Sequence, residues 1–454
     1  MEPIKLKAIL SAVIIASGAF MMIAIGTGAT ATAYQAHGLA IDFGQREVVW
    51  TDADLHLIND PIELLIFACV ENGFSSDIDI ASGIVSEING VMSDTERKWN
   101  FWVIDRGENE WRKTSPPFDL VLLDYTSCAW AYCSDTERPT VGADQAGNSI
   151  FGYARPQNTV SLSPSITEIF GSLGAVSTLV GTDRYSNYPD TVVERQQSGR
   201  INIMGSWQNP SFELIMGTDP DMVFCDGSQY THHELSDRLR RSDVVAIVMY
   251  SGESIDTILD NIYIVGLTLQ YDMAALEVIK QLEDARELIV TKLMAGNTEF
   301  VRTMLSLSPD KSPWVSGSYT YANDIMTTVF GENVMPDSFY GWVHATSAII
   351  ASSNPSVIMI LSYNHQATQA EYDNMLASLS GEWRYTDAYK NGQIYLLCED
   401  LGEMASRPGP RCAQLMELMA MILHPEVFDE KLPKFIGNEY ESYLTITAGL
   451  GFNI

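Results

Sequence analysis

The sequence predicts an α/β protein with two Rossmann-like lobes joined by a long bridging helix and preceded by a small α+β domain. Two observations carry this prediction. Apolar residues recur at helical spacing over Asp272–Leu293, a length that gives a rod of roughly 33 Å. On each side of that rod, short apolar strands alternate with helix-like segments, which is typical of a sheet covered by helices.

The composition favours a folded binding protein. The 454 residues allow two or three domains, and 46% of them are hydrophobic. A formal net charge of −31 opposes nucleic-acid binding, because the phosphate backbone would repel the protein. The sequence holds no phosphate-binding glycine loop, no Gly-x-Ser-x-Gly turn and no His-Glu-x-x-His motif. We therefore expect no enzymatic activity and no resident cofactor.

The N-terminus carries the pattern of a secretory signal. Lys5 and Lys7 precede an uncharged apolar run over residues 8–25, and alanines follow at the spacing of a cleavage site. Residues 1–33 are therefore predicted as a signal peptide or, if uncleaved, as an anchor that attaches the protein to the cell membrane. Because no cysteine lies near the end of the run, a lipid anchor is not expected. A buried helix is the alternative, which the two lysines disfavour.

Residues 36–135 predict a small α+β domain. A helix is expected at Pro61–Asn72, ended by Gly73, with strands near 84–91, 99–104 and 120–132. Glycines and prolines over 136–157 predict a linker to the next domain. The six cysteines of the chain are too scattered to define a disulfide framework or a zinc site, so we interpret them as structural.

The remaining boundaries follow from the strand and helix pattern. We predict an N-terminal α/β lobe at 158–253, bridging helices at 254–294, a C-terminal α/β lobe at 295–435 and a tail at 436–454. Strand, helix and strand follow one another within Thr159–Pro189, where Ser163 or Ser165 can cap the helix. Ligands of open α/β sheets bind beyond the carboxyl ends of such strands, which turns attention to the loops there.

An internal repeat relates the two lobes. Trp207 precedes Pro220 by thirteen residues, and Trp342 precedes Pro355 by the same number. In both segments a helix-like stretch with isoleucine five residues before the proline leads into a buried apolar strand. The two segments are offset by 135 residues. The repeat predicts that each lobe presents one tryptophan from an equivalent loop.

Aromatic residues mark the predicted strand-end loops. The candidates are Tyr185, Trp207, Tyr230, Tyr340 and Trp342. As a set they suit a large, flat, partly apolar ligand, although any single one is as easily explained as a core residue. Four histidines, at 232, 233, 344 and 365, also fall in predicted loops, but they lack the converging partners of a metal site. Only His344, which shares a face with Trp342 on an extended segment, stays a candidate ligand contact.

An ordered series of segments resembles the helix-bridged substrate-binding proteins of ABC importers for cobalamin, haem and iron-siderophores. The segments, which together cover about residues 158–430, are VSLSPSITEIFGSLGAVSTLVGTDRYSNYP, GSWQNPSFELIMGTDPDMVF, SIDTILDNIYIVGLTLQ, SGSYTYANDIMTTVFGENV, GWVHATSAIIASSNPSVIMI and RPGPR running to HPEVF. The resemblance, closest to the cobalamin branch, implies two lobes on a rigid helix, a cleft that closes only slightly, and delivery of ligand to a membrane permease and its ATPase.

The resemblance also implies roles for particular residues. Positions of the family's cleft loops match Ser163, Pro164, Tyr185, Trp207, Trp342 and the loop at Arg407. Members of the family dock on the permease through one acidic residue on each lobe. Glu213 matches the first, whereas the second falls at Ala348, which departs from the family pattern.

The first domain resembles, more weakly, the small carboxy-terminal domain of cobalamin carriers. The matching segments are PIELLIFACVENG and GIVSEINGVMSDTERKWNFWV. Both resemblances favour a corrinoid such as cobalamin as the transported ligand. Two alternatives stay open: a ferric siderophore or haem on the same fold, with Tyr185, Tyr340 or His344 near the iron, and a surface interaction or sensing protein with a degenerate binding module.

Overall fold

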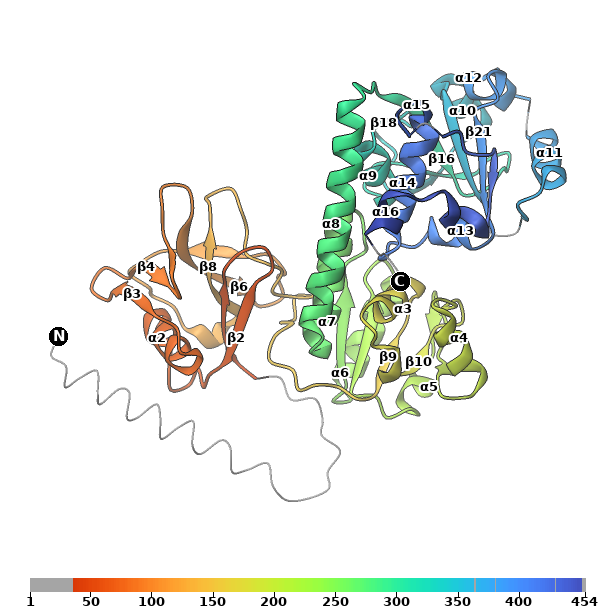
Figure 1. Cartoon of the computed structure of the whole chain (residues 1–454). Helices are drawn as coiled ribbons and strands as arrows, with labels where there is room; N and C mark the ends of the chain where they lie inside the picture. The colour runs from red at the N-terminus through yellow and green to blue at the C-terminus, as the bar shows by residue number, and fades with distance from the viewer. Residues whose placement is uncertain (1–35, 363–364, 380, 429, 451–454) are drawn as a thin grey trace. The chain divides into compact units, whose positions relative to one another are not determined.

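The bridging element is α8 (Asp272–Ala295), which runs alongside both lobes in Figure 1. Its buried residues are the seven that the helical spacing predicts: Ala275, Val278, Ile279, Leu282, Ala285, Ile289 and Leu293. The preceding helix α7 (Ile255–Leu269) packs against it, and Gly266 allows the close approach, because a Cβ there would lie 2.3 Å from that of Ala275. The bridge is thus a helix pair.

The computed structural model describes residues 36–362, 365–379, 381–428 and 430–450. The chain divides into two units, Met1–Arg155 and Pro156–Ile454. The predicted signal or anchor at 1–33 lies outside the described residues. Within the described part, none of the helices has the length and apolar character needed to span a membrane.

The N-terminal lobe of the second unit is a parallel five-stranded sheet. Its strand order is β11 (Asn202–Ile203), β10 (Leu179–Thr182), β9 (Thr159–Ser161), β14 (Met222–Asp226) and β15 (Val245–Met249). The helices of this lobe are α3 (Pro164–Ser172), α4 (Asp190–Gln197), α5 (Phe212–Met216) and α6 (Tyr230–Arg240). A short hairpin, β12 (Gly205–Ser206) with β13 (Asn209–Pro210), lies before α5. The predicted strand, helix and strand within 159–189 are present.

The C-terminal lobe is built on a mixed sheet. Its order is β19 (Trp342–His344), β17 (Trp314–Ser316), β16 (Val301–Ser306), β20 (Val357–Ser362), β21 (Ile394–Cys398) and β22 (Phe435–Ile436), with β18 (Gly331–Asn333) beside β16. The strands pair in parallel except β17 with β16 and β19. The helices are α9 (Tyr321–Thr328), α10 (Ser347–Ser353), α11 (Gln369–Ser378), α12 (Asp387–Lys390), α13 (Glu399–Met404), α14 (Cys412–Leu423) and α15 (Pro425–Phe428). The α/β class with two lobes and a bridging helix is therefore confirmed.

The C-terminal segment is fastened to this lobe. The Glu417 carboxylate, fully buried on α14, accepts hydrogen bonds from the backbone of Thr445, Ile446 and Thr447 at the start of α16 (Ile446–Gly449). Since a buried charge needs such partners, the described part of the predicted tail is a packed element of the fold.

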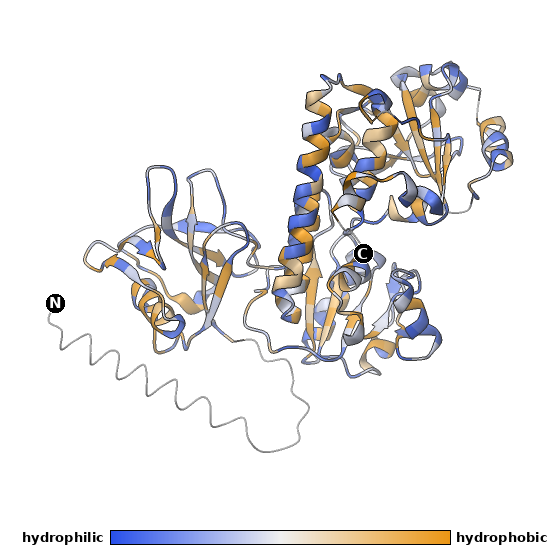
Figure 2. Ribbon diagram, in the orientation of Figure 1, coloured by the Kyte–Doolittle hydropathy of each residue, from blue (hydrophilic) through white to orange (hydrophobic). Residues whose placement is uncertain are grey.

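The first unit has an α+β fold of its own. One sheet runs β2 (Val48–Asp52), β1 (Gly38–Asp42), β8 (Tyr125–Cys133), β6 (Lys98–Asp105) and β7 (Arg112–Thr114), and a second joins β3 (Ser76–Asp79), β4 (Ile84–Ile88) and β5 (Val91–Met92). Helix α2 spans Pro61–Asn72 and ends at Gly73 with φ 69°, as predicted. In Figure 2 apolar (orange) and hydrophilic (blue) stretches are mixed within this unit, and much of α2 is orange.

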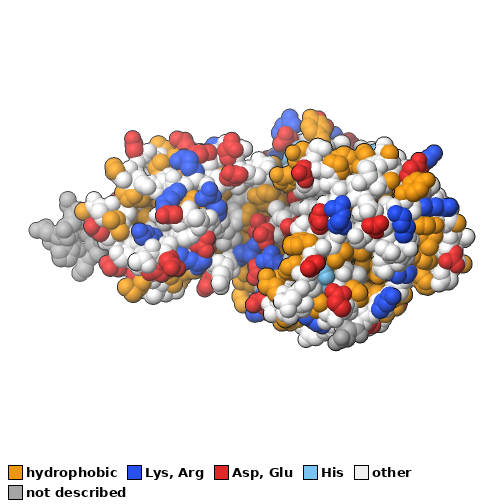
Figure 3. Space-filling view, turned by 90° about the horizontal axis from the view of Figure 1, so that it is seen from above, with side chains coloured by type: hydrophobic (Ala, Val, Ile, Leu, Met, Phe, Trp, Pro, Cys, Tyr) orange, Lys and Arg blue, Asp and Glu red, His pale blue; other side chains and the backbone are white. Residues whose placement is uncertain are grey.

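The segment predicted as a linker is packed rather than free. The Trp111 indole donates to the Thr140 carbonyl at 2.8 Å, and a Cβ on Gly142 would lie 2.2 Å from that ring. Phe151 stacks on Trp50 with ring centroids 5.0 Å apart. The glycine at 142 therefore serves close packing, and most of 136–157 belongs to the first unit. On the face shown in Figure 3, acidic and basic side chains are interspersed among apolar ones.

Candidate functional site

The loop between β9 and α3 carries the first two candidate residues. Ser163 is buried and occupies the cap position of α3, but its side chain forms no capping bond and instead pairs with the Ser165 hydroxyl at 2.7 Å. Ser163 therefore stands at the predicted cap position, but the predicted capping hydrogen bond to its hydroxyl is absent. Pro164 is the first residue of α3, where its missing N–H costs no hydrogen bond.

The loop after β10 presents Tyr185. Its backbone N–H donates to the buried Asp183 carboxylate at 2.8 Å, and the Ser186 hydroxyl donates to the same group. Burial raises the pKa of Asp183 above its ordinary value, and these two hydrogen bonds oppose that rise. The Tyr185 side chain is 47% exposed. The loop thus holds the backbone firmly and leaves the ring at the surface.

Arg407 links this loop to the other lobe. Its guanidinium donates to the Tyr185 carbonyl at 3.1 Å and to the Asn187 side chain at 2.7 Å. It also pairs with Glu403 at 2.7 Å, on its own lobe, and with Glu168 of α3 at 3.3 Å. The predicted candidate Arg407 is therefore engaged by both lobes.

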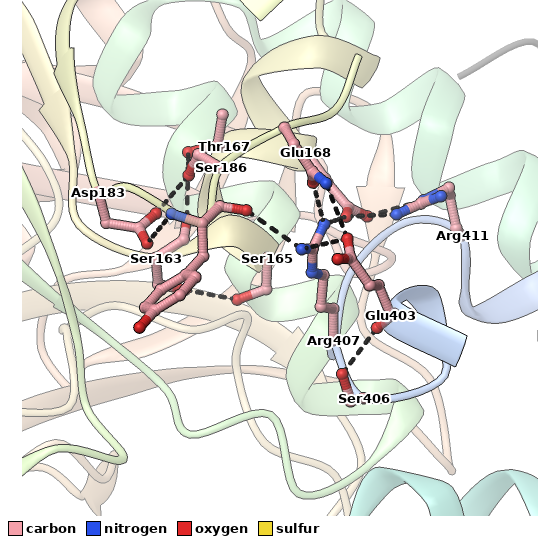
Figure 4. Close-up of polar contacts among 12 residues, drawn as sticks. Ser163, Ser165, Thr167, Glu168, Asp183, Ser186, Glu403, Ser406, Arg407 and Arg411 are labelled. Atoms are coloured by element: carbon pink, nitrogen blue, oxygen red, sulfur yellow. Dashed lines mark hydrogen bonds and ion pairs between the residues drawn. The ribbon is translucent and has the colours of Figure 1, made fainter. Parts of the chain in front are cut away.

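Arg411 completes what we call the interlobe ion-pair cluster, formed by Glu168, Glu403, Arg407 and Arg411. Arg411 binds both carboxylate oxygens of Glu168, at 3.0 and 2.6 Å. Figure 4 shows both arginines directed at Glu168. The side chains of Glu168 and Arg411 are only 1% and 3% exposed, so each charge depends on the other.

The electrostatics of the cluster follow from its burial. Desolvation alone would lower the pKa of Arg411, but the Glu168 carboxylate keeps it above its ordinary value. The guanidinium also lies 4.0 Å from the centre of the Tyr188 ring. Two carboxylates balance two guanidinium groups, so the cluster adds little net charge to the site. It is suited to joining the lobes.

Trp207 lies in the β12–β13 hairpin and is held by the end of β14. Its indole N–H donates to the Asp226 carboxylate at 2.9 Å, and its carbonyl lies 2.6 Å from Nε2 of His232. His232 and His233 belong to α6, not to a solvated loop as predicted, and His232 is fully buried because the hairpin covers it. Tyr230 starts the same helix and is 75% exposed.

The C-terminal lobe presents its aromatic candidates differently. Tyr340 is 66% exposed and lies 5.8 Å from the ring of Tyr319, which is 64% exposed. Trp342 opens strand β19 opposite Ser316. His344, at the other end of that strand, packs on Trp314 at 4.0 Å and its Nδ1 contacts the Ser312 carbonyl at 3.0 Å.

The candidates therefore fall into separate groups. Arg407 contacts the Tyr185 loop and, through Glu168, the helix that Pro164 begins. Trp207 is bonded to the helix that Tyr230 begins. In the C-terminal lobe, Tyr340 lies beside Tyr319 and His344 beside Trp314. Among the described residues, no cluster of three or more His, Cys, Asp or Glu side chains could hold a metal ion.

Sequence reasoning missed Glu168 and Arg411. A signal was available, because Glu168 stands among Ile166, Ile169 and Phe170 in a short apolar helix, and a buried carboxylate needs a cation or hydrogen-bond donors. The segment RPGPR offered two arginines in a chain with only 27 basic residues.

The docking positions occupy equivalent places in the two lobes. Glu213 is the second residue of α5, with a side chain 75% exposed that pairs with Arg238 at 3.2 Å. Ala348 is the second residue of α10 and is exposed. The equivalence follows from the 135-residue offset, so the missing acid is a difference between matched positions.

Comparison with known proteins identifies the class of this fold and site. Residues 159–401 match the periplasmic binding protein family, to which the chain belongs. Its members are substrate-binding proteins of ABC importers. The chain is 24% identical over 298 residues to an uncharacterized ABC transporter substrate-binding lipoprotein, YvrC, of Bacillus subtilis (strain 168), covering 65% of this chain and 89% of that protein.

Two further relatives have names that mention ligands. A vitamin B12-binding protein of Salmonella choleraesuis (strain SC-B67) is 24% identical over 212 residues, which cover 46% of this chain and 73% of that protein. The solved structure of a periplasmic heme-binding protein from Roseiflexus sp. RS-1 in apo form has a TM-score of 0.50 and 19% identity, covering 60% of this chain and 99% of that one. The structural likeness supports the fold alone.

Proposed function

We propose that this substrate-binding protein captures cobalamin or a related corrinoid outside the cytoplasm and delivers it to the permease and ATPase of an ABC importer. The observation that carries the proposal is the set of exposed and half-buried rings from both lobes: Tyr185, Trp207 and Tyr230 from one, and Tyr340 and Trp342 from the other. Such rings bind a large flat ligand by area and stacking, with little loss of side-chain entropy.

Two further considerations favour a corrinoid. Curated relatives matching this region are named vitamin B12-binding proteins. The first unit separately resembles the small domain of cobalamin carriers through the segments around α2 and β4–β6. The corrinoid would be cargo rather than a cofactor, and the predicted N-terminal segment would keep the protein secreted or attached to the cell membrane.

A ferric siderophore or haem is the second candidate ligand. It is favoured by the similar fold of a protein named as a periplasmic heme-binding protein and by the exposed phenols of Tyr185 and Tyr340, which are suitable iron contacts. A third possibility, a surface interaction or sensing protein, is motivated by Ala348 at the second docking position.

Titration of the purified full chain with cyanocobalamin, haemin and a ferric hydroxamate would distinguish these ligands. We expect cyanocobalamin to bind with micromolar or tighter affinity, and no binding at micromolar ligand would contradict the proposal. Tyr185→Phe and Tyr340→Phe are matched variants, because they keep the rings and remove the phenols. They should leave corrinoid affinity nearly unchanged but weaken an iron ligand. Stabilisation by none of the three ligands would favour the sensing alternative.

A further inference from the structure

His232 is a buried side chain whose two ring nitrogens are both occupied. Nδ1 accepts a hydrogen bond from the backbone N–H of Asp226 at 2.8 Å, and Nε2 lies 2.6 Å from the carbonyl oxygen of Trp207. A backbone N–H can only donate and a carbonyl can only accept. The ring must therefore be neutral, with its proton on Nε2.

Asp226 supplies the second hold on the same tryptophan. One carboxylate oxygen accepts from the Trp207 indole at 2.9 Å, and the other accepts from the backbone and hydroxyl of Ser228. Thr231 adds a hydrogen bond to the carbonyl of Gln208, the next residue of the hairpin. Trp207 is consequently fixed at its backbone by α6 and at its ring by the end of β14.

Protonation of His232 would be incompatible with this arrangement. A second ring proton would place an N–H at Nδ1 against the N–H of Asp226, so two donors would face each other. The titratable groups near the ring are the Asp226 carboxylate, which favours the charged form, and His233, which opposes it. Burial outweighs the carboxylate and lowers the pKa of His232 below its ordinary value, in agreement with the neutral ring.

We propose that His232 is a positioning residue that holds Trp207 ready for the ligand, and that acidification loosens this hold and weakens ligand binding. The inference rests on the proposed function only in assigning Trp207 to the ligand. The pH sensitivity of the Trp207 environment follows from the fold itself and can be measured without ligand.

The first measurement uses no ligand. The difference in tryptophan fluorescence between the wild-type chain and Trp207→Phe, followed as the pH is lowered stepwise from 7.5 to 4, isolates the contribution of Trp207. We expect this difference signal to change with pH in the wild type and in His233→Gln, a control on the same helix. In the His232→Gln background, where the amide can accept and donate without titrating, it should stay constant. The same pH change in both backgrounds would overturn the inference.

The second measurement is the affinity for cyanocobalamin over the same pH range, with circular dichroism to confirm that each variant is folded at each pH. We expect roughly a tenfold loss of affinity on acidification of the wild type, equivalent to losing about one well-made hydrogen bond. His232→Gln should show the same affinity at the two ends of the pH range, whatever its affinity at pH 7.5. Retained pH dependence in His232→Gln contradicts the inference, whereas absent binding at pH 7.5 together with the expected fluorescence result contradicts only the choice of ligand.

Discussion

The two repeated segments place a tryptophan in each lobe but support it by different means. Trp207 is bonded through its ring to Asp226 and through its backbone to His232. At the offset of 135 residues, Asp226 corresponds to Leu361, whose side chain cannot accept a hydrogen bond. The structure gives the Trp342 indole no hydrogen-bond partner among the described residues. Conservation of the strand and loop therefore does not extend to the polar support.

This difference means that the N-terminal lobe holds its tryptophan in place before the ligand binds, whereas the aromatic side chains of the C-terminal lobe are free to adjust. A ring already fixed in its bound position loses little entropy when the ligand arrives, whereas exposed rings such as Tyr319 and Tyr340 must be ordered by it. We infer that the N-terminal lobe contributes orientation and that the C-terminal lobe adjusts to the ligand. The interlobe ion-pair cluster is common to both lobes and is independent of the repeat.

The largest expected effect comes from breaking the interlobe ion-pair cluster. Glu168→Ala should lower the free energy of unfolding by about 3–5 kcal/mol, because it leaves the Arg411 charge buried and unpaired. Urea unfolding of the full chain measures the change. Glu403→Gln is the matched control: its carboxylate is 28% exposed, and we expect a loss of about 1 kcal/mol. Equal effects of the two substitutions would show that burial does not decide the strength of the cluster.

The next effect compares the two tryptophans directly. Trp207→Ala should weaken ligand binding by about 2 kcal/mol and Trp342→Ala by about 1 kcal/mol, because only the first removes a ring that is already in position. Calorimetric titration with cyanocobalamin measures both affinities. Trp314→Ala, which alters the ring beneath His344, serves as a control for general loss of aromatic surface. A larger loss at Trp342 would reverse our assignment of the lobe that holds its tryptophan in place before the ligand binds.

Local patterns predicted much of this architecture. The spacing within α8 identified all seven of its buried residues, and the sequence also predicted the limits of α2. These features depend on neighbours within a few residues. The bond between Glu168 and Arg411 joins positions 243 residues apart, which no local pattern can specify. The sequence predicts a solvated loop for His232, whereas the side chain is buried. Its burial depends on a hairpin about 25 residues earlier in the chain, which the residues around His232 do not reveal.

A third prediction compares two buried histidines, one from each lobe. Burial lowers the pKa of His232 and of His424, so the stability that each neutral ring contributes is present above the ordinary histidine pKa and is lost as the pH falls towards the lowered value. His424 binds the Val329 carbonyl at 2.9 Å, and its other nitrogen lies 3.9 Å from the Glu426 carboxylate, whose negative charge favours a protonated ring. In His232 the nitrogen that would gain the second proton, Nδ1, instead faces the backbone N–H of Asp226.

Thermal unfolding at pH 7.5 and pH 5 tests this difference. We expect His232→Gln to reduce the loss of stability on acidification more than His424→Gln does. The two variants match each other because both remove a buried imidazole bonded to a carbonyl. If His424→Gln protected the fold as well as His232→Gln, the backbone donor opposite Nδ1 would not be the cause.

The smallest expected effect on stability concerns the docking positions. Ala348→Glu places a carboxylate in the first turn of α10, where the helix dipole favours it, so the free energy of unfolding should change by no more than about 0.5 kcal/mol. Ligand affinity should not change, because only the docking surface is altered.

Delivery of the ligand to the permease is the informative measurement. Uptake of labelled cyanocobalamin by cells that carry the protein with its permease should fall with Glu213→Ala. Ala348→Glu should raise uptake if the permease offers a basic partner to both lobes, and should leave it unchanged if docking depends on the N-terminal lobe alone. Undiminished uptake with Glu213→Ala would contradict docking through α5 and would extend the asymmetry of the two lobes to the permease.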